Sequence, residues 1–227
     1  MTRSSRQATP QSVDGAVGQR VTVDTVIFTI RDNELQALLV RRAIAPYKGR
    51  WAIPGGFVLA NESLDDAARR ELREETGVGD VWLEQLYTFG DPKRDPRGRV
   101  VTVAYFALVS PDRAPLLAGS DAAEARWWPA TNPPHPLAFD HQHILSVALE
   151  RLRGKLSYTN IGFELLPQKF TLSQLQRVHE AILGETLDKR NFRKRVDALG
   201  VVRPLNESMR DGTGRPAQLF TFRRGPH

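Results

Sequence analysis

Three glutamates in the stretch from Ser63 to Gly77 have the spacing of a metal-binding site on a helix. Glu71, Glu74 and Glu75 are three and four residues apart, so a helix of about 3.6 residues per turn brings them to one side. The residues expected to face the interior on that side are Leu64, Ala67 and Ala68. Carboxylate oxygens on adjacent turns suit Mg²⁺ or Mn²⁺, so a divalent cation would relieve the repulsion among the glutamates.

The helix that carries these glutamates has recognisable ends. Ser63 is a natural N-cap, negative charge in the first turn is favoured, and Gly77 is a natural stop. The alternative to a metal site is a solvent-exposed acidic helix, whose glutamates pair with Arg69, Arg70 and Arg73 on the opposite side. The helical spacing alone leaves both interpretations open.

The residues that flank the helix favour the metal site. Gly56 is followed after five residues by Glu62, and after seven more by "RELREETGV" from Arg70. This spacing resembles the Nudix box at every defined position. In that family the box is a loop and helix that bind Mg²⁺ against the pyrophosphate of a nucleoside diphosphate linked to another group. The resemblance implies that the three glutamates are metal ligands, that Arg70 orients one of them, and that Gly56 lets the backbone turn close to the metal.

Composition fits a globular protein of a reducing compartment. The 227 residues are enough for one large domain or two modest ones. There are no cysteines, which excludes disulfides, thiolate zinc sites and cysteine nucleophiles. The N-terminus has no apolar signal segment, and the longest apolar run, ten residues from Val100, is too short to span a bilayer. We therefore expect a cytoplasmic protein without a membrane partner.

Charge is unevenly distributed along the chain. Residues 1–150 hold 17 Lys and Arg against 19 Asp and Glu, whereas residues 151–227 hold 15 against 7. The whole net charge of +6 therefore comes from the last third. A basic segment after a near-neutral one indicates a polyanion partner for the C-terminal part. A basic surface that serves only solubility is the alternative.

The order of patterns predicts an α+β protein. Residues 1–19, which are rich in small polar side chains, are expected to form a mobile arm. Residues 20–154 are expected to form the first domain, a mixed sheet between helices, as the Nudix resemblance implies. Its expected strands are "RVTVDTVIFTI", "ELQALLVRRA", "WAIPGGF", "VWLEQLYTFG", "VVTVAYFALV" and "EARWWPA". A polar loop, "DPKRDPRGR", separates two of them, and a helix spans roughly Asp140 to Arg153.

Residues 155–227 have the pattern of a winged helix-turn-helix. One helix is capped by Thr171 and stops at Gly184, and a second is capped by Asp188 and stops at Gly200. Two short strands follow, "VVRPL" and "QLFTFR", which would form the wing. The apolar side of the first helix is expected to comprise Leu172, Leu175, Val178, Ile182 and Leu183, and that of the second Phe192, Val196 and Leu199.

The opposite side of the second helix is basic and is expected to enter the major groove of double-stranded DNA. The residues expected to contact DNA are Arg190, Asn191, Arg193 and Lys194 on the helix, and Arg215 at the wing. The alternative is a small interaction domain whose helices merely pack. RNA fits less well, because the sequence shows no exposed aromatic platform for stacked bases.

The whole chain from about Val21 to Phe222 is similar to the NrtR family, the Nudix-related transcriptional regulators of bacterial NAD metabolism. The stretches that carry the similarity are "WAIPGGFV", "DPRGRVVTVAYFALV", "RWWP", "PLAFDH", "VHEAILG", "NFRKRV" and "GRPAQLF". The resemblance implies a homodimeric repressor that binds a palindromic operator and releases it when ADP-ribose, or a related nucleotide, enters the Nudix domain. Relatives of the family regulate sugar utilisation instead, so a sugar is the other effector to consider.

The intact box leaves an enzymatic alternative. Some members of the family have lost box glutamates, but this chain has all of them, so Mg²⁺-dependent hydrolysis of ADP-ribose to AMP and ribose 5-phosphate stays open. Arg41, Arg42 and Lys48 could meet phosphate, beside Gly55 and Gly56. Glu124 is considered as a second acid, although a plain surface role is the simpler interpretation.

Two further clusters are considered for binding roles. His135, His141 and His143 suggest zinc, but residues two apart do not share a helix face, so capping and local hydrogen bonds explain them better. Trp127 and Trp128 are neighbours on a strand and must face opposite ways. One is expected in the core, and the other over a ligand base or a domain interface.

Overall fold

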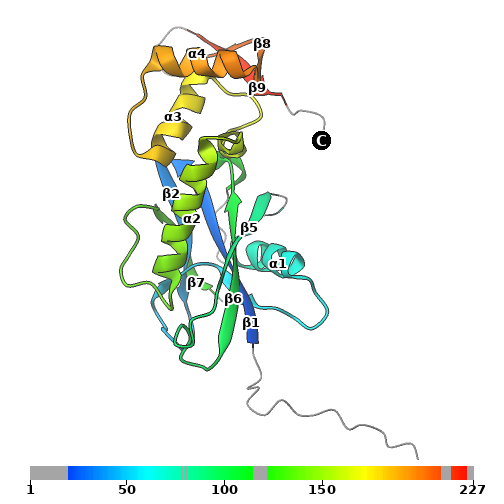
Figure 1. Ribbon diagram of the computed structural model, residues 1–227, viewed down its shortest axis with the longest axis vertical. Coiled ribbons are helices and arrows are strands. Elements are labelled where there is room, and N and C mark those ends of the chain that lie inside the picture. Colours follow the sequence, from blue (N-terminus) through cyan, green and yellow to red (C-terminus); the bar gives the residue numbers. More distant parts are fainter. Residues whose placement is uncertain (1–19, 78, 80, 115–121, 211–215, 224–227) are drawn as a thin grey trace, which may run out of the picture.

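The computed structural model describes residues 20–77, 79, 81–114, 122–210 and 216–223. The predicted arm, residues 1–19, and the wing residue Arg215 lie outside the described residues. Figure 1 shows a sheet with a helix on each side in the lower part and a smaller helical part with a hairpin above it. This arrangement confirms the predicted α+β class, a mixed sheet between helices followed by a winged helix.

The large sheet is mixed, as predicted. Its strands are β1 (Arg20–Arg31), β2 (Glu34–Arg42), β3 (Trp51–Ala52), β4 (Gly55–Phe57), β5 (Trp82–Phe89), β6 (Val100–Leu108) and β7 (Ala122–Pro129). The central strand β1 runs parallel to β6 and antiparallel to β2 and β4, while β7 pairs with β2. The two-residue turn between β1 and β2 places Asp32 and Asn33 at positive φ, which suits a tight hairpin.

Alternation along β1 creates the two faces of the sheet. Val26 and Phe28 pack against helix α2 (His141–Leu156) in the main core, whereas Val23 packs against Ala67 and Ala68 of helix α1 (Leu64–Thr76). Figure 1 shows the two helices on opposite sides of the strands. The helix of the box therefore lies on the face away from α2, with its two alanines fully buried.

The ends of the predicted helices are confirmed. The Ser63 side chain accepts a hydrogen bond from the Asp66 N–H at the start of α1, and Gly77 ends that helix in the left-handed conformation. Helix α3 (Leu172–Leu183) begins with a capping box between Thr171 and Gln174. The remaining caps, also as predicted, are Gly184 for α3, and Asp188 and Gly200 for α4 (Lys189–Leu199).

The smaller part contains the helices and the hairpin of a winged helix. It also has two features that the sequence patterns did not predict. A 3-10 helix (Ile161–Leu165) follows α2, and the hairpin of β8 (Val202–Met209) and β9 (Ala217–Phe222) is extended by a third chain segment at Phe170. Phe170 and Phe220 exchange backbone hydrogen bonds of 3.0 and 2.8 Å. The hairpin is therefore anchored to the segment just before α3.

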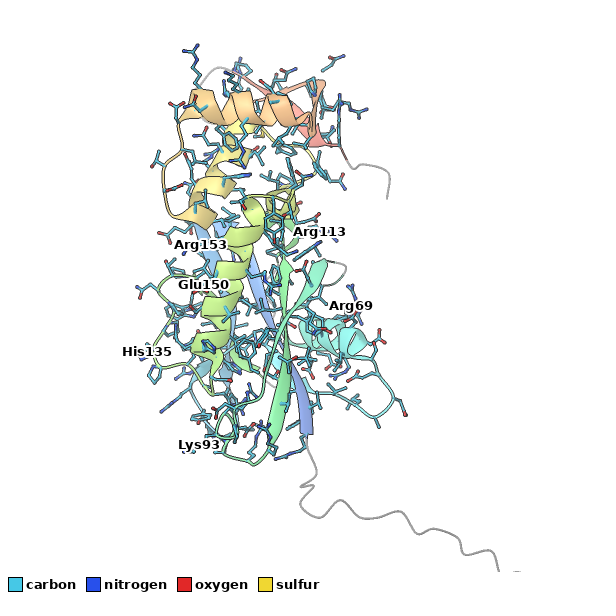
Figure 2. All side chains as sticks on the ribbon, viewed as in Figure 1. Arg69, Lys93, Arg113, His135, Glu150 and Arg153 are labelled. Atoms are coloured by element: carbon cyan, nitrogen blue, oxygen red, sulfur yellow. The ribbon has the colours of Figure 1, made fainter. Side chains whose placement is uncertain are left out.

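The two parts are packed together. The main hydrophobic core runs without interruption from the sheet through α2 to α3, α4 and β8. The Arg153 side chain of α2 donates from Nε to the Ile182 carbonyl at the end of α3, at 2.9 Å. Arg153 is labelled at this junction in Figure 2. The sheet and the winged helix are thus connected by a continuous α2 helix.

Several sequence predictions were wrong in detail. "WAIPGGF" forms two strands, β3 and β4, that pair with different partners rather than one strand. Strand β8 extends to Met209, because the polar residues after Leu205 continue the pairing with β9. Leu199 is 59% exposed, since it is the last residue of α4 and lies beyond the packed turns, and Leu64 in the first turn of α1 is exposed too. Within the described parts of the chain, no helix is long and apolar enough to cross a membrane.

Candidate functional site: an acidic cavity and a basic helix

A cavity of about 370 Å³ opens between strand β4, the first half of β1 and the C-terminal half of α1. Gly55, Gly56 and the three box glutamates line it, so the structure brings together the residues that the sequence placed at one site. Arg41 and Arg42 line it from β2. The cavity is polar on the side of the carboxylates and has aromatic rings at Phe57 and Phe139.

The two glycines give the glutamates room. A Cβ atom on Gly56 would lie 2.1 Å from Oε1 of Glu71, and one on Gly55 would lie 2.3 Å from the Val23 carbonyl oxygen. The Gly55 N–H donates to Oε2 of Glu75 at 3.0 Å. A side chain at Gly56 would therefore displace the Glu71 carboxylate, and one at Gly55 would push β4 away from β1.

Arg70 lies among the glutamates, which corrects the prediction that it faces the opposite side of α1. Its guanidinium donates to Oε1 of Glu71 at 2.7 Å, to Oε2 of Glu74 at 3.1 Å and to both oxygens of Glu62 at 2.7 and 2.9 Å. The helical angle describes only the direction of Cβ, and the long arginine side chain bends back across the turn. The implied orienting role of Arg70 fits this geometry, and Glu62 in turn holds Arg70.

The carboxylates of the cavity have different proton affinities. Burial, reinforced by the negative charge of Glu71, raises the pKa of Glu75 to about 8. Burial also raises the pKa of Glu71, against the neighbouring Arg70 guanidinium. Glu62 lies at the other extreme, because its hydrogen bonds from Arg70 lower its pKa to about 2. Glu75 is therefore the carboxylate that most needs a cation before it ionises.

The residues present fit a hard divalent cation. Glu71 and Glu75 lie on the same cavity wall, offer only oxygen donors, and are crowded as like charges in a place where burial disfavours ionisation. Glu74 is 57% exposed and is bound to Arg70. Consequently, within the described residues, no three acidic or histidine side chains are already grouped closely enough to hold a metal ion. Glu74 would join the other two by rotating its own exposed side chain.

A buried ion network next to the glutamates was missed by the sequence patterns. Arg94, with 3% of its side chain exposed, donates to both oxygens of Asp140 at 2.8 and 2.9 Å and to Oδ2 of Asp24 at 3.4 Å. The ring of His141 accepts a 2.8 Å hydrogen bond from the Ile53 N–H, and its other nitrogen lies 3.6 Å from Oδ1 of Asp24. Arg94 and Asp24 come from a loop and a strand that the sequence reading treated as structural.

Aromatic rings and guanidinium groups form another part of the cavity wall. The Arg97 guanidinium lies 5.1 Å from the ring centre of Phe57 and 5.4 Å from that of Phe139, and Asp95 fixes it by a 2.7 Å ion pair. Arg42 lies 4.8 Å from the Phe139 ring. This wall offers positive charge and flat apolar surface together, as an anionic ligand with a ring would require.

Some of the residues considered for the site lie elsewhere. Lys48 is exposed and does not line the cavity. Glu124 on β7 pairs with Arg41 at 3.7 Å and with Arg126 at 3.4 Å, and it also lies outside the cavity lining. The cross-strand register explains this position, because Glu124 is directly opposite Arg41. Arg41 itself donates to the Gly49 carbonyl at 3.1 Å.

The histidine and tryptophan clusters separate in space. His135 is exposed on a loop (Figure 2), His141 is buried against Ile53 and Asp24, and His143 packs edge-on against Phe89. The partner of His141 is 88 residues away, so its hydrogen bond is not the local one that we expected. The two tryptophans face opposite sides of the sheet, as predicted: Trp127 joins the cluster with Leu72, and Trp128 packs against Trp51.

The exposed side of α4 presents the predicted DNA-binding residues. Arg190, Asn191, Arg193 and Lys194 are all exposed, while Phe192 and Val196 on the other side are buried. Within the described residues, none of the three cations makes an ion pair. The neighbouring hairpin is tied to the segment before α3 by the ion pair of Lys169 with Glu207, at 2.7 Å. Lys189 and Asp197 complete a shallow groove along this side of α4.

Comparison with known proteins matches two family models to successive parts of the chain. Residues 20–147 match the NUDIX domain and residues 162–222 the NrtR DNA-binding winged helix domain. The ADPR-responsive transcriptional repressor NtrR of Acinetobacter baylyi is 41% identical over 205 residues, which cover 89% of this chain and 81% of the repressor.

Two solved structures of one relative are also similar. Shewanella oneidensis NrtR in complex with a 27mer DNA has a TM-score of 0.80 and 38% identity, covering 89% of this chain and 93% of that one. The NUDIX domain of the same NrtR in complex with ADP ribose has a TM-score of 0.56 and 39% identity, covering 63% of this chain and 94% of that one.

Fold, cavity and basic helix together define a Nudix domain joined to a DNA-binding winged-helix domain. The chain belongs to the NrtR family of Nudix-related transcriptional regulators. The family and the fold class predicted from the sequence are thereby confirmed.

Proposed function

We propose that this protein is a transcriptional repressor that binds DNA through α4 and the β8–β9 hairpin and responds to ADP-ribose bound in the acidic cavity. The observation that carries the proposal is the presence, in one chain, of the box cavity and of an exposed basic helix on a fold similar to an NrtR in complex with DNA. Genes of NAD metabolism are its proposed targets. A homodimer would bind a palindromic operator, with two basic helices spaced for two half-sites. We place the domain boundary near Gly154, within α2.

In the cavity, the diphosphate of ADP-ribose would lie between the carboxylates and the arginines. Glu71 and Glu75, joined by Glu74, would hold Mg²⁺ or Mn²⁺, which neutralises the diphosphate when bound. Arg41 and Arg42 would meet phosphate oxygens, and Gly55 and Gly56 let the ligand approach the backbone. Lys48, which is exposed outside the lining, could reach only the outer part of a ligand. Arg70 and Glu62 would hold Glu71 in position.

The proposal is tested by measuring DNA affinity with and without the ligand. A labelled duplex from upstream of the protein's own operon would be titrated in the absence and presence of saturating ADP-ribose with Mg²⁺. We expect ADP-ribose to weaken binding by about 5–150-fold, the range of an ordinary allosteric coupling. A scrambled duplex is the control for nonspecific binding. Equal operator affinity with and without ADP-ribose, and with related nucleotides and sugars, would remove the effector role for that set.

A second activity is supported by the complete box. All three glutamates and Arg70 are present and line the cavity, so the chain has the groups needed for a Mg²⁺-dependent ADP-ribose pyrophosphatase. Incubation with ADP-ribose and Mg²⁺ or Mn²⁺ would release AMP and ribose 5-phosphate, detected by chromatography. Glu75→Gln is the control that abolishes metal-dependent turnover. If the wild type releases no AMP, the cavity serves binding alone.

A further inference from the structure

A second cavity, of about 330 Å³, is lined by the end of α2, the segment after it, α3 and α4. Figure 1 shows α3 and α4 in the upper part of the molecule, above α2. None of the residues that line the acidic cavity lines this one. Its buried apolar wall comprises Leu156, Leu175, Phe192 and Val196, and Tyr158 and Leu199 lie exposed at its edge. Its volume lies at the lower end of the range found for small-molecule sites.

Some of the polar groups around this cavity are already hydrogen-bonded, and others are free to meet a ligand. The hydroxyl groups of Ser157 and Thr159 donate to the carbonyl oxygens of Gly154 and Lys155. The Nδ1 atom of His179 lies 2.9 Å from the Leu175 carbonyl oxygen, which can only accept, so Nδ1 carries the proton. Burial lowers the pKa of His179, so its ring is neutral and Nε2 is left as an acceptor. Within the described residues, the side chains of Arg195, Asn160 and Tyr158 make no hydrogen bond or ion pair. Arg195 is close enough for its charge to lower the pKa of His179 further.

We propose that this cavity binds a small organic monoanion with an apolar ring, of the aromatic carboxylate or sulfonate class. The apolar wall suits the ring, and Arg195 at the rim supplies one positive charge. The neutral His179 would accept a hydrogen bond from an N–H or O–H substituent on the ring of the ligand, and Asn160 and Tyr158 would donate to its anionic group. A nucleoside diphosphate carries more charge than this single cation neutralises, so the ligand class differs from that of the acidic cavity. The occupant would touch both the linker after α2 and α4, and would hold the two in one relative position.

The probe for this site is anilinonaphthalene sulfonate, an aromatic monoanion that fluoresces when it leaves water. The full-length chain would be titrated with this probe, as wild type, as Arg195→Gln and as the matched control Arg193→Gln. Both arginines are exposed on α4, but only Arg195 lines this cavity. We expect Arg195→Gln to weaken probe binding about five- to tenfold, the loss of one charge-assisted contact at a partly open rim, and Arg193→Gln to match the wild type.

Two further measurements locate the bound probe. Val196→Phe fills the apolar wall and should reduce the number of bound probes by one, with circular dichroism confirming that the helices remain. Saturating ADP-ribose with Mg²⁺ should leave the probe in place. The proposal fails if Arg195→Gln binds the probe as the wild type does, or if ADP-ribose displaces it. Because the ADP-ribose effect on DNA is measured without the probe, failure of one proposal is distinguishable from failure of the other.

Discussion

Around the acidic cavity, the charged side chains are mostly buried and already hold one another, whereas the cations of α4 are exposed and unpaired within the described residues. Arg94 is bound between Asp24 and Asp140, and Arg70 is bound by three glutamates. On α4, by contrast, Arg190, Arg193 and Lys194 project into solvent. Both regions are charged, but only the first has its charges positioned before any ligand arrives.

This difference has energetic consequences. A buried charge that loses its partner remains desolvated. Substitutions of charged residues around the cavity should therefore lower the free energy of unfolding strongly. An exposed cation is already solvated, and its removal should barely affect folding. The effect of removing such a cation appears only in the complex with DNA, where phosphates or bases replace the water around it. Salt weakens this contact. Substitutions around the cavity should therefore change folding stability and ligand affinity. Substitutions of the exposed cations on α4 should change DNA affinity alone.

The largest expected effect is on folding, from Arg94→Leu. Removing this guanidinium leaves Asp24 and Asp140 without their cation, and Asp24 lies in a buried strand beside Glu75. We expect the free energy of unfolding to fall by about 3–5 kcal/mol, as for other buried pairs that lose one partner. Urea denaturation followed by circular dichroism measures it.

The matched control is Arg126→Leu, which removes a half-exposed cation that pairs with Glu124 at 3.4 Å. It should change the free energy of unfolding by at most about 1 kcal/mol. If the two variants were equally stable, the buried network would have no special role, and the contrast between cavity and helix would not hold.

The next effect is on metal affinity, from Glu75→Gln. A ligand carboxylate is replaced by a neutral amide of the same shape, and outer-shell changes alone commonly cost about 10–100-fold. We expect Mg²⁺ or Mn²⁺ affinity, measured by calorimetry in the presence of ADP-ribose, to fall by at least about 100-fold. The fold should survive, because the variant removes a carboxylate that burial disfavours. Glu34→Gln, on an exposed strand end, is the control, and unchanged metal affinity in Glu75→Gln would exclude Glu75 as a ligand.

On the basic helix, Arg193→Ala should lower DNA affinity without changing folding stability or ligand affinity. If Arg193 reads a base, its loss should cost about 1–3 kcal/mol on the operator and relax preference at one position. Loss of a phosphate contact, which we expect for Lys194→Ala, should weaken all duplexes alike and lower the salt slope by about one. Affinities would be measured over a salt series on operator and scrambled duplexes, with Arg126→Ala as the control. Operator binding equal to wild type in an Arg193→Ala/Lys194→Ala double variant would rule out this helix as the DNA reader.

The same contrast explains how much could be predicted from the sequence. The caps Ser63, Thr171 and Asp188 act within three residues, and the spacing of the box glutamates is a property of one helix, so local patterns identified both. The partners of Arg94 are 46 and 70 residues away, so only the folded sheet reveals them. Arg70 was misplaced because a helical angle does not describe where a long flexible side chain ends. The exposed cations of α4 needed no long-range contact, and their exposure was predicted correctly.

The smallest expected effect, taken per pH unit, is a pH dependence that only the cavity should show. Burial and the charge of Glu71 raise the pKa of Glu75 to about 8. A carboxylate must be deprotonated to bind a metal ion, so below about pH 8 each bound cation displaces a proton. Metal affinity should therefore rise by at most about tenfold per pH unit up to about pH 8 and then level off.

Folding of the metal-free chain should change in the opposite direction. Because the folded state holds the Glu75 proton more tightly than the unfolded chain, this group favours folding at low pH. Its contribution is lost as the pH rises from the ordinary glutamate range through about 8, and added Mg²⁺ should restore stability most at the alkaline end. Thermal unfolding from pH 5 to 9, with and without Mg²⁺, measures both trends, and Glu75→Gln should flatten them. A wild-type profile as flat as that of the variant would mean that Glu75 ionises without a cation. The stability of the cavity would then depend on its charges no more than that of the exposed helix does.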